Sequence, residues 1–155
     1  MSKGEIANLI VQGLIWLAMI ATFIVYALQL KAMRKSSQGQ NILSLVNYLQ
    51  AQDVREARRV VRTTLKEKVS KSEPWNDSEE RAASLVCSTY DVAAILIRSG
   101  VVPSKPFMEN WGPSILDCYE ILRSYIKNMQ LPEKSGPEYW DDFDWFYQQV
   151  KNRST

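Results

Sequence analysis

The chain has 155 residues, with 19 Lys or Arg against 17 Asp or Glu and a formal net charge of +2. It contains no histidine, which excludes Ser-His-Asp and Cys-His catalysis and removes the commonest protein ligand of transition metals. Its two cysteines, Cys87 and Cys118, fall in apolar helical patterns, so we expect both to be buried and reduced.

An uncharged apolar run from Ile6 to Leu30 predicts a transmembrane helix. Its 25 residues would rise about 37 Å as a helix, enough to cross a hydrocarbon core of about 30 Å. A cleaved signal peptide has a shorter apolar region, and an interfacial helix carries a charged face. We therefore expect one span over residues 6–30, with the helix extending to about residue 35.

Positive charges beside the apolar run predict its orientation in the plasma membrane. Lys31, Arg34 and Lys35 follow the run, whereas Lys3 and Glu5 cancel before it. The positive-inside rule therefore predicts an N-terminus outside the cell and a cytoplasmic C-terminal domain. Lys31, Arg34 and Lys35 are also the candidate contacts with the lipid surface.

The charge gradient along the chain agrees with this orientation. Residues 31–72 carry a net charge of +7, and residues 73–155 carry a net charge of −5. Anionic lipid of the cytoplasmic leaflet attracts nearby Lys and Arg by about 1 kcal/mol each, which favours the basic part near the membrane.

The remaining sequence predicts an all-α fold: a linker at residues 36–40 and a cytosolic domain at 41–152, with four to five helices. Within the domain, Asp53 and Glu56 form a capping-box pattern, and Asp77 or Ser78 is expected to cap the next helix. No stretch alternates at period two, so we expect no sheet. The expected helices are 42–51, 54–69, 79–99, 113–129 and 137–152; Gly112-Pro113 is expected to break the helical pattern around it.

Asp91 lies inside the most apolar of these predicted helices. A buried carboxylate needs a partner, because an unpaired buried charge costs several kcal/mol. The preceding helix offers three arginines, so we predict a buried structural ion pair between Asp91 and Arg58, Arg59 or Arg62. A ligand or switch site at the same residues is the alternative.

The basic helix at residues 54–71 has three interpretations: a solvated face, a contact with anionic lipid, or a nucleic-acid surface. Nucleic acid is the least favoured partner, because no aromatic side chains interleave with the arginines to stack on bases. Near the C-terminus, Trp145 falls beside Asp141 and Asp144, opposite the apolar face of its helix. If exposed, Trp145 is a candidate partner-binding residue.

The sequence carries none of the common enzyme signatures: it has no P-loop, GxGxxG, GxSxG, CxxC or HExxH pattern. Asp91, Asp117 and Glu120 could meet across two helices as a carboxylate site. Di-iron bundles, however, use Glu-x-x-His pairs, and this chain has no histidine. We therefore predict no catalytic residue, no cofactor and no metal.

Four segments carry a resemblance to a known family: DVREARRVV, YDVAAILIRSGVV, WGPSILDCYEIL and EYWDDFDWFYQQV. The sequence resembles small bacterial single-pass membrane proteins of unknown function with a cytosolic all-helical domain. The resemblance covers most of residues 41–150 and implies a bacterial inner-membrane location and a helical fold. It implies no activity.

These observations favour a non-enzymatic, membrane-tethered interaction protein: a scaffold, sensor or accessory subunit. The expected partners are the lipid bilayer and either another protein or a second copy of the chain. The alternative is a ligand-responsive signalling or defence effector that acts through oligomerisation of the membrane helix. A pocket lined by Arg58, Arg59 and Asp91 would favour the alternative, whereas a solid core with an exposed aromatic patch would favour a scaffold.

Overall fold

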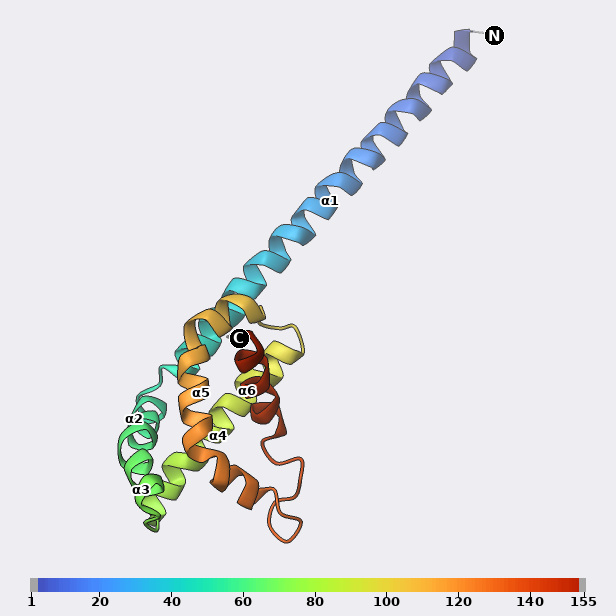
Figure 1. Ribbon diagram of the computed structural model, residues 1–155. Helices are drawn as coiled ribbons and strands as arrows, with labels where there is room; N and C mark the ends of the chain where they lie inside the picture. The colour runs from blue at the N-terminus through green and yellow to red at the C-terminus, as the bar shows by residue number, and fades with distance from the viewer. Residues whose placement is uncertain (1–2, 154–155) are drawn as a thin grey trace. The chain divides into compact units, whose positions relative to one another are not determined.

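The computed structural model describes residues 3–153, and over this range the chain is all-helical, with five helices and no strand. This confirms the predicted fold class. One of the five helices has three consecutive parts, the middle of which is π-helical. The elements are α1 (Lys3–Leu49), α2 (Gln52–Val60), η1 (Val61–Leu65), α3 (Lys66–Lys71), α4 (Asp77–Arg98), α5 (Ser104–Met129) and α6 (Asp141–Arg153) (Figure 1).

Helix α1 continues through residues 36–40, so the predicted linker is wrong. Two serines and a glycine lower helix propensity by about 1 kcal/mol or less each, and an established helix adds residues without a new nucleation step. Packing nevertheless divides the chain after Gln40, giving one unit at 1–40 and a second at 41–155. In the first unit, α1 is long and apolar enough to cross a membrane, judged by length and composition.

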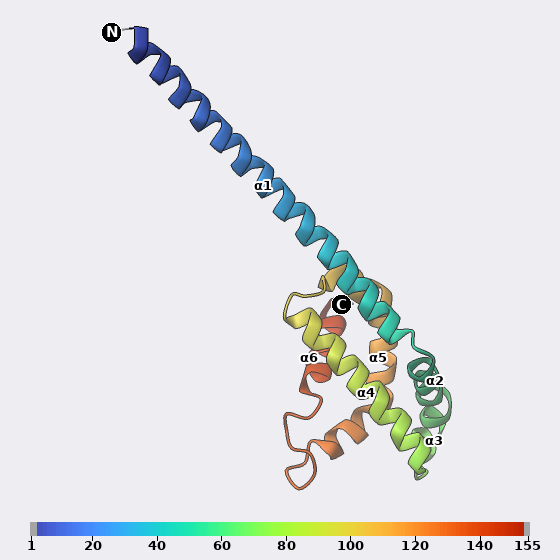
Figure 2. The same cartoon turned by 180° about the vertical axis from the view of Figure 1, so that it is seen from behind.

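The second unit is a helical bundle in which α4 contacts α2, α5 and α6 (Figure 2). The sequence of α4 explains this central place, because its apolar side chains are spread over most of its circumference. Among its residues, Val86, Cys87 and Tyr90 are fully buried. Tyr90 stacks on Phe143 of α6 with their ring centroids 5.3 Å apart.

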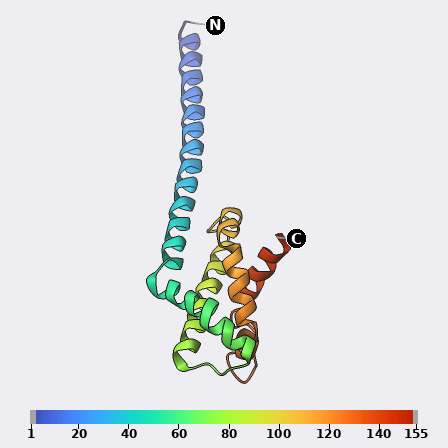
Figure 3. The same ribbon diagram turned by 60° about the vertical axis from the view of Figure 1, so that its left-hand side comes forward.

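Helix α5 runs through Gly112-Pro113, so the predicted break there is also wrong. Proline removes one backbone hydrogen bond, but the residues on both sides of it are buried, including Phe107 and Ile115. A Cβ on Gly112 would lie 3.0 Å from Cγ1 of Val150, so the glycine allows α5 and α6 to approach closely. Figure 3 shows these two helices side by side.

Helix ends differ from the predicted caps. Helix α4 begins with a capping box between Asn76 and Glu79, in place of the expected cap at Asp77 or Ser78. The Asp53–Glu56 box does not form, because α2 begins earlier, after Ala51, and Asp53 accepts its bond from the N–H of the next residue. Helix α6 starts at Asp141 and not near residue 137.

Candidate functional site

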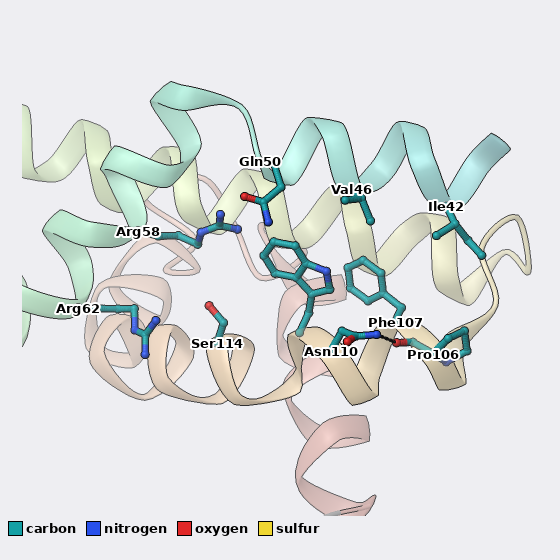
Figure 4. A pocket seen from close by; sticks show the side chains of 10 residues that line it. Ile42, Val46, Gln50, Arg58, Arg62, Pro106, Phe107, Asn110 and Ser114 are labelled. Carbon is teal, nitrogen blue, oxygen red and sulfur yellow. Dashed lines mark hydrogen bonds between the residues drawn. The ribbon is translucent and has the colours of Figure 1, made fainter. Parts of the chain in front are cut away.

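A pocket of about 570 Å³ opens on the second unit, bounded by the end of α1, by α2 and η1, and by the first half of α5 (Figure 4). Two of its walls carry arginine, and none of its lining residues carries a carboxylate. The lining side chains are Ile42, Val46, Gln50, Arg58, Arg62, Pro106, Phe107, Asn110, Trp111 and Ser114.

Arg58 is the most unusual of these residues because its side chain is only 8% exposed. Its Nη2 donates a hydrogen bond of 2.7 Å to the carbonyl oxygen of Leu49, at the end of α1. Its Cζ lies 4.8 Å from the centroid of the Trp111 ring, a cation–π contact. Its Nη1 is buried and makes no hydrogen bond of ordinary length among the described residues, and the guanidinium lies near the hydroxyl of Tyr90, whose pKa it acts to lower.

The charge of Arg58 also lacks a carboxylate partner within residues 3–153. A buried charge left without a counter-charge costs several kcal/mol. Aromatic and backbone contacts offset part of this cost, but they leave the donor at Nη1 unsatisfied. The arrangement at Arg58 is therefore suited to an incoming anion.

Arg62 provides the second positive charge from the π-helical segment η1. Its Nε donates a 2.6 Å hydrogen bond to Oδ2 of Asp117, which raises the pKa of the guanidinium. Asp117 also lies 3.5 Å from Nζ of Lys66, so one carboxylate serves two cations. The π-helical turn is an irregularity of the kind often found at functional sites.

A second hollow, of about 490 Å³, adjoins the pocket and shares Arg58 and Arg62 with it. It adds three more cations, Arg55, Arg59 and Lys66, and one carboxylate, Asp117. The pocket and this hollow together are lined by five cations of α2, η1 and α3, with Asp117 among them.

Ser114 closes the pocket beside the core. Its Oγ lies 2.8 Å from the hydroxyl of Tyr90, and burial raises the pKa of Tyr90 to about 12. The phenol therefore stays neutral at physiological pH and adds no negative charge. The pocket's charge comes from its two guanidinium groups.

Comparison with known families supplies the classification. A family model described as a domain of unknown function, DUF4760, matches residues 16–150. The chain belongs to the DUF4760 family. No curated protein and no solved structure matches it. The DUF4760 match includes much of the apolar part of α1 as well as the bundle, so the long helix and the pocket belong to one family unit.

The DUF4760 fold separates Asp91 from the arginines predicted to pair with it, so that prediction is wrong. Oδ1 of Asp91 accepts a 3.0 Å hydrogen bond from the backbone N–H of Phe143, in the first turn of α6. Each predicted partner is engaged elsewhere: Arg58 with Leu49, Arg59 with Glu56, and Arg62 with Asp117. The cause is the helix rotation, because Asp91 contacts α6 while Arg58 and Arg62 contact α1 and α5.

Three carboxylates meet where Asp91 reaches α6. Oxygens of Asp91, Asp141 and Asp142 lie within 4.8 Å of one another. Asp142 is also paired with Arg98 at 2.8 Å, and the N–H groups of a helix start attract carboxylates without any metal. Burial raises the pKa of Asp91, and its two acidic neighbours raise it further, while the bond from Phe143 opposes them. Asp117 and Glu120 do not join this group in the described structure.

Trp145 is partly buried, so it is not the fully exposed side chain that a partner-binding residue would favour. Its ring stacks near Phe146 at 6.3 Å, and Cζ of Arg98 lies 5.7 Å from its centroid. By contrast, the predicted lipid contacts Lys31, Arg34 and Lys35 are all exposed on α1.

Most of the pocket of this DUF4760 protein is not apparent from its sequence. Arg58 and Arg62 were identified but assigned to Asp91, Trp111 was placed just before an expected helix break, and Ser114 fell inside the expected helix 113–129 without any assigned role. The four-residue spacing of the two arginines was the available signal, because such residues share one helix face. The wall that this face meets depends on contacts across 50 residues or more, such as Arg62 with Asp117.

Proposed function

We propose that this protein is a non-enzymatic interaction protein tethered to the bacterial inner membrane by α1, with its bundle in the cytoplasm. The bundle would act there as a scaffold, sensor or accessory subunit for a protein partner or a second copy of the chain. The observation that supports the tether is the surface of α1.

Between Val11 and Leu30, every residue of α1 is exposed and none is charged. Phe23, for example, is 78% exposed. Soluble monomers rarely show a continuous apolar patch above a few hundred Å², whereas this helix is apolar around its whole circumference. A bilayer would bury these side chains, and the helix satisfies its own backbone hydrogen bonds as a spanning segment must.

The exposed cations at Lys31, Arg34 and Lys35 support the proposed orientation, because positive residues flanking a span favour the cytoplasmic side. They follow directly after the uncharged run. Their attraction to anionic lipid adds about 1 kcal/mol each.

Cysteine labelling tests both location and orientation. Cys87 and Cys118 are buried, and burial raises the pKa of both thiols, that of Cys118 to about 11, so the native chain provides an unreactive background. We expect Ser2→Cys to react with a membrane-impermeant maleimide in intact cells, and Ser37→Cys to react only after permeabilisation. The opposite pattern would contradict the orientation. Recovery of the full chain in the soluble fraction without detergent would contradict the tether.

The arginine pocket favours a second function, that of a ligand-responsive effector acting through association of α1 helices. Its support is the unsatisfied, buried Arg58 in a pocket of about 570 Å³. In cells, the Ser37→Cys variant should form disulfide-linked dimers under added oxidant to a different extent when Arg62→Gln is also present. Equal dimer yields in the two backgrounds would contradict this function.

A further inference from the structure

The pocket is polarised from one end to the other. Figure 4 shows Ile42, Val46, Pro106 and Phe107 toward one end, and the guanidinium groups of the two arginines toward the other. Along the first wall, Ile42 is eight positions before Gln50, which corresponds to about 12 Å of helix. A ligand that fits both ends therefore has an apolar part and a charged part.

The cationic end specifies the sign of the charged part. Nη1 of Arg58 is a buried donor that makes no hydrogen bond of ordinary length among the described residues. Among the described residues, Arg62 has one carboxylate partner, Asp117, which it shares with Lys66. Guanidinium groups present forked donors that match the oxygens of carboxylates and phosphates.

The apolar end specifies the rest of the ligand. Phe107 is 4% exposed and stacks on Trp111 with the ring centroids 6.1 Å apart. Trp111 also makes the cation–π contact with Arg58, so its ring already has two neighbours. A flexible aliphatic group lying along Ile42 and Val46 therefore fits better than a second flat ring stacked on Trp111.

We propose that this pocket binds an amphiphilic organic anion, with its carboxylate or phosphate against Arg58 and Arg62 and its aliphatic group along Ile42, Val46 and Phe107. This inference names the ligand class of the ligand-responsive function and rests on that function for the effect of binding on α1 association. Ligand binding itself is measured separately from dimer yield. Gln50 follows Leu49, the residue that holds Arg58, and its exposed side chain makes no hydrogen bond among the described residues. Its amide group lines the pocket and is therefore available to contact the anion as well.

The binding test uses the full chain in phosphatidylcholine nanodiscs, with calorimetric titration of three probes. Hexyl phosphate carries both parts of the ligand, inorganic phosphate carries the anion, and 1-hexanol carries the aliphatic group. Hexyl phosphate should bind roughly ten-fold more tightly than either single-part probe. Equal affinity for 1-hexanol would overturn the anionic part, and equal affinity for inorganic phosphate would overturn the aliphatic part.

Variants locate the binding. Arg62→Gln should weaken hexyl phosphate binding by roughly ten-fold, and its half-exposed side chain makes this change compatible with folding. Val46→Trp should fill the apolar end and weaken hexyl phosphate while leaving inorganic phosphate unchanged. Arg81→Gln, an exposed arginine of α4 that lines neither hollow, is the matched control. An equal loss in the control and in Arg62→Gln would overturn the site.

The source of the anion is tested by the composition of the nanodisc. If membrane fatty acid occupies the pocket, adding oleic acid to the disc should weaken the apparent binding of hexyl phosphate. Unchanged binding would identify a ligand from the aqueous phase, and both results support the pocket. The two proposals can fail separately. If hexyl phosphate binds as expected but Arg62→Gln leaves the dimer yield unchanged, this inference stands and the ligand-responsive function is contradicted.

Discussion

Asp91 and Arg58 both place an ionisable group against the apolar core, and the backbone stabilises each of them. Arg58 donates to the carbonyl of Leu49 at the C-terminal end of α1, where a helix is partly negative. Asp91 accepts from the N–H of Phe143 at the N-terminal end of α6, where a helix is partly positive. The two charges therefore bind opposite helix ends rather than each other.

For Asp91, the hydrogen bond and the charge can be separated by substitution. Asp91→Ala removes the acceptor for Phe143 and should destabilise the bundle by about 1–2 kcal/mol. Asp91→Asn keeps an acceptor and removes the repulsion from Asp141 and Asp142, so it should cost less. Thermal unfolding of the full chain in detergent, followed by near-UV circular dichroism, measures both. Equal losses in the two variants would show that the charge matters more than the bond.

Helix α4 is stabilised by an N-terminal cap that lies one or two residues before the position expected from the sequence. Asn76 accepts from the backbone N–H groups of Ser78 and Glu79, both at 3.0 Å, and Glu79 returns a bond to the N–H of Asn76 at 2.8 Å. Lys68 of α3 also donates to Glu79 at 2.9 Å, which ties the end of α3 to the start of α4. The cap therefore joins two helices as well as starting one.

Loss of this cap should be measurable. Asn76→Ala is expected to reduce stability by about 1 kcal/mol, because two N–H groups of α4 lose their acceptor. Asp53→Ala is the control: Asp53 lies in the first turn of α2 but caps no helix, so its loss should be smaller. Urea titration of the full chain in detergent gives the two free energies. A larger loss for Asp53→Ala would contradict the observed cap.

The bundle as a whole combines carboxylates with opposite pH behaviour. Burial raises the pKa of Asp144, but hydrogen bonds from Tyr119, Lys127 and Gln130 outweigh burial and lower it overall. A lowered pKa means that Asp144 stabilises the folded state above its unfolded pKa and loses this effect as pH falls through its folded pKa. Asp91 has a raised pKa, so its ionisation opposes folding at neutral pH, and protonation relieves the cost as pH falls.

These opposite signs predict how substitutions change acid unfolding. Asp144→Asn should make the unfolding temperature less dependent on pH below about 5, because it removes a carboxylate whose stabilising effect is lost on acidification. Asp91→Asn should make the unfolding temperature more dependent on pH, because it removes a carboxylate whose destabilising charge is neutralised on acidification. Near-UV circular dichroism melts from pH 3 to pH 7 provide the measurement. Parallel curves for the wild type and both variants would contradict the assignment.

Local patterns were enough to predict the helical class, the position of the apolar helix and the approximate extent of α4, because periodicity and uncharged length depend on nearby residues. They failed at residues 36–40 and at Gly112-Pro113, where weak helix formers stay helical. At Gly112-Pro113, packing on both sides of the proline outweighs about 3 kcal/mol of propensity.

The residues of the candidate pocket were likewise predictable only in part. Arg58 and Arg62 were identified from composition and spacing, and their shared helix face was predictable. The residues that they contact were not, because Leu49, Trp111 and Asp117 belong to other helices. The rotation of each helix about its own axis follows from the packing of the entire bundle, and that rotation determines which charges meet and which one remains unpaired.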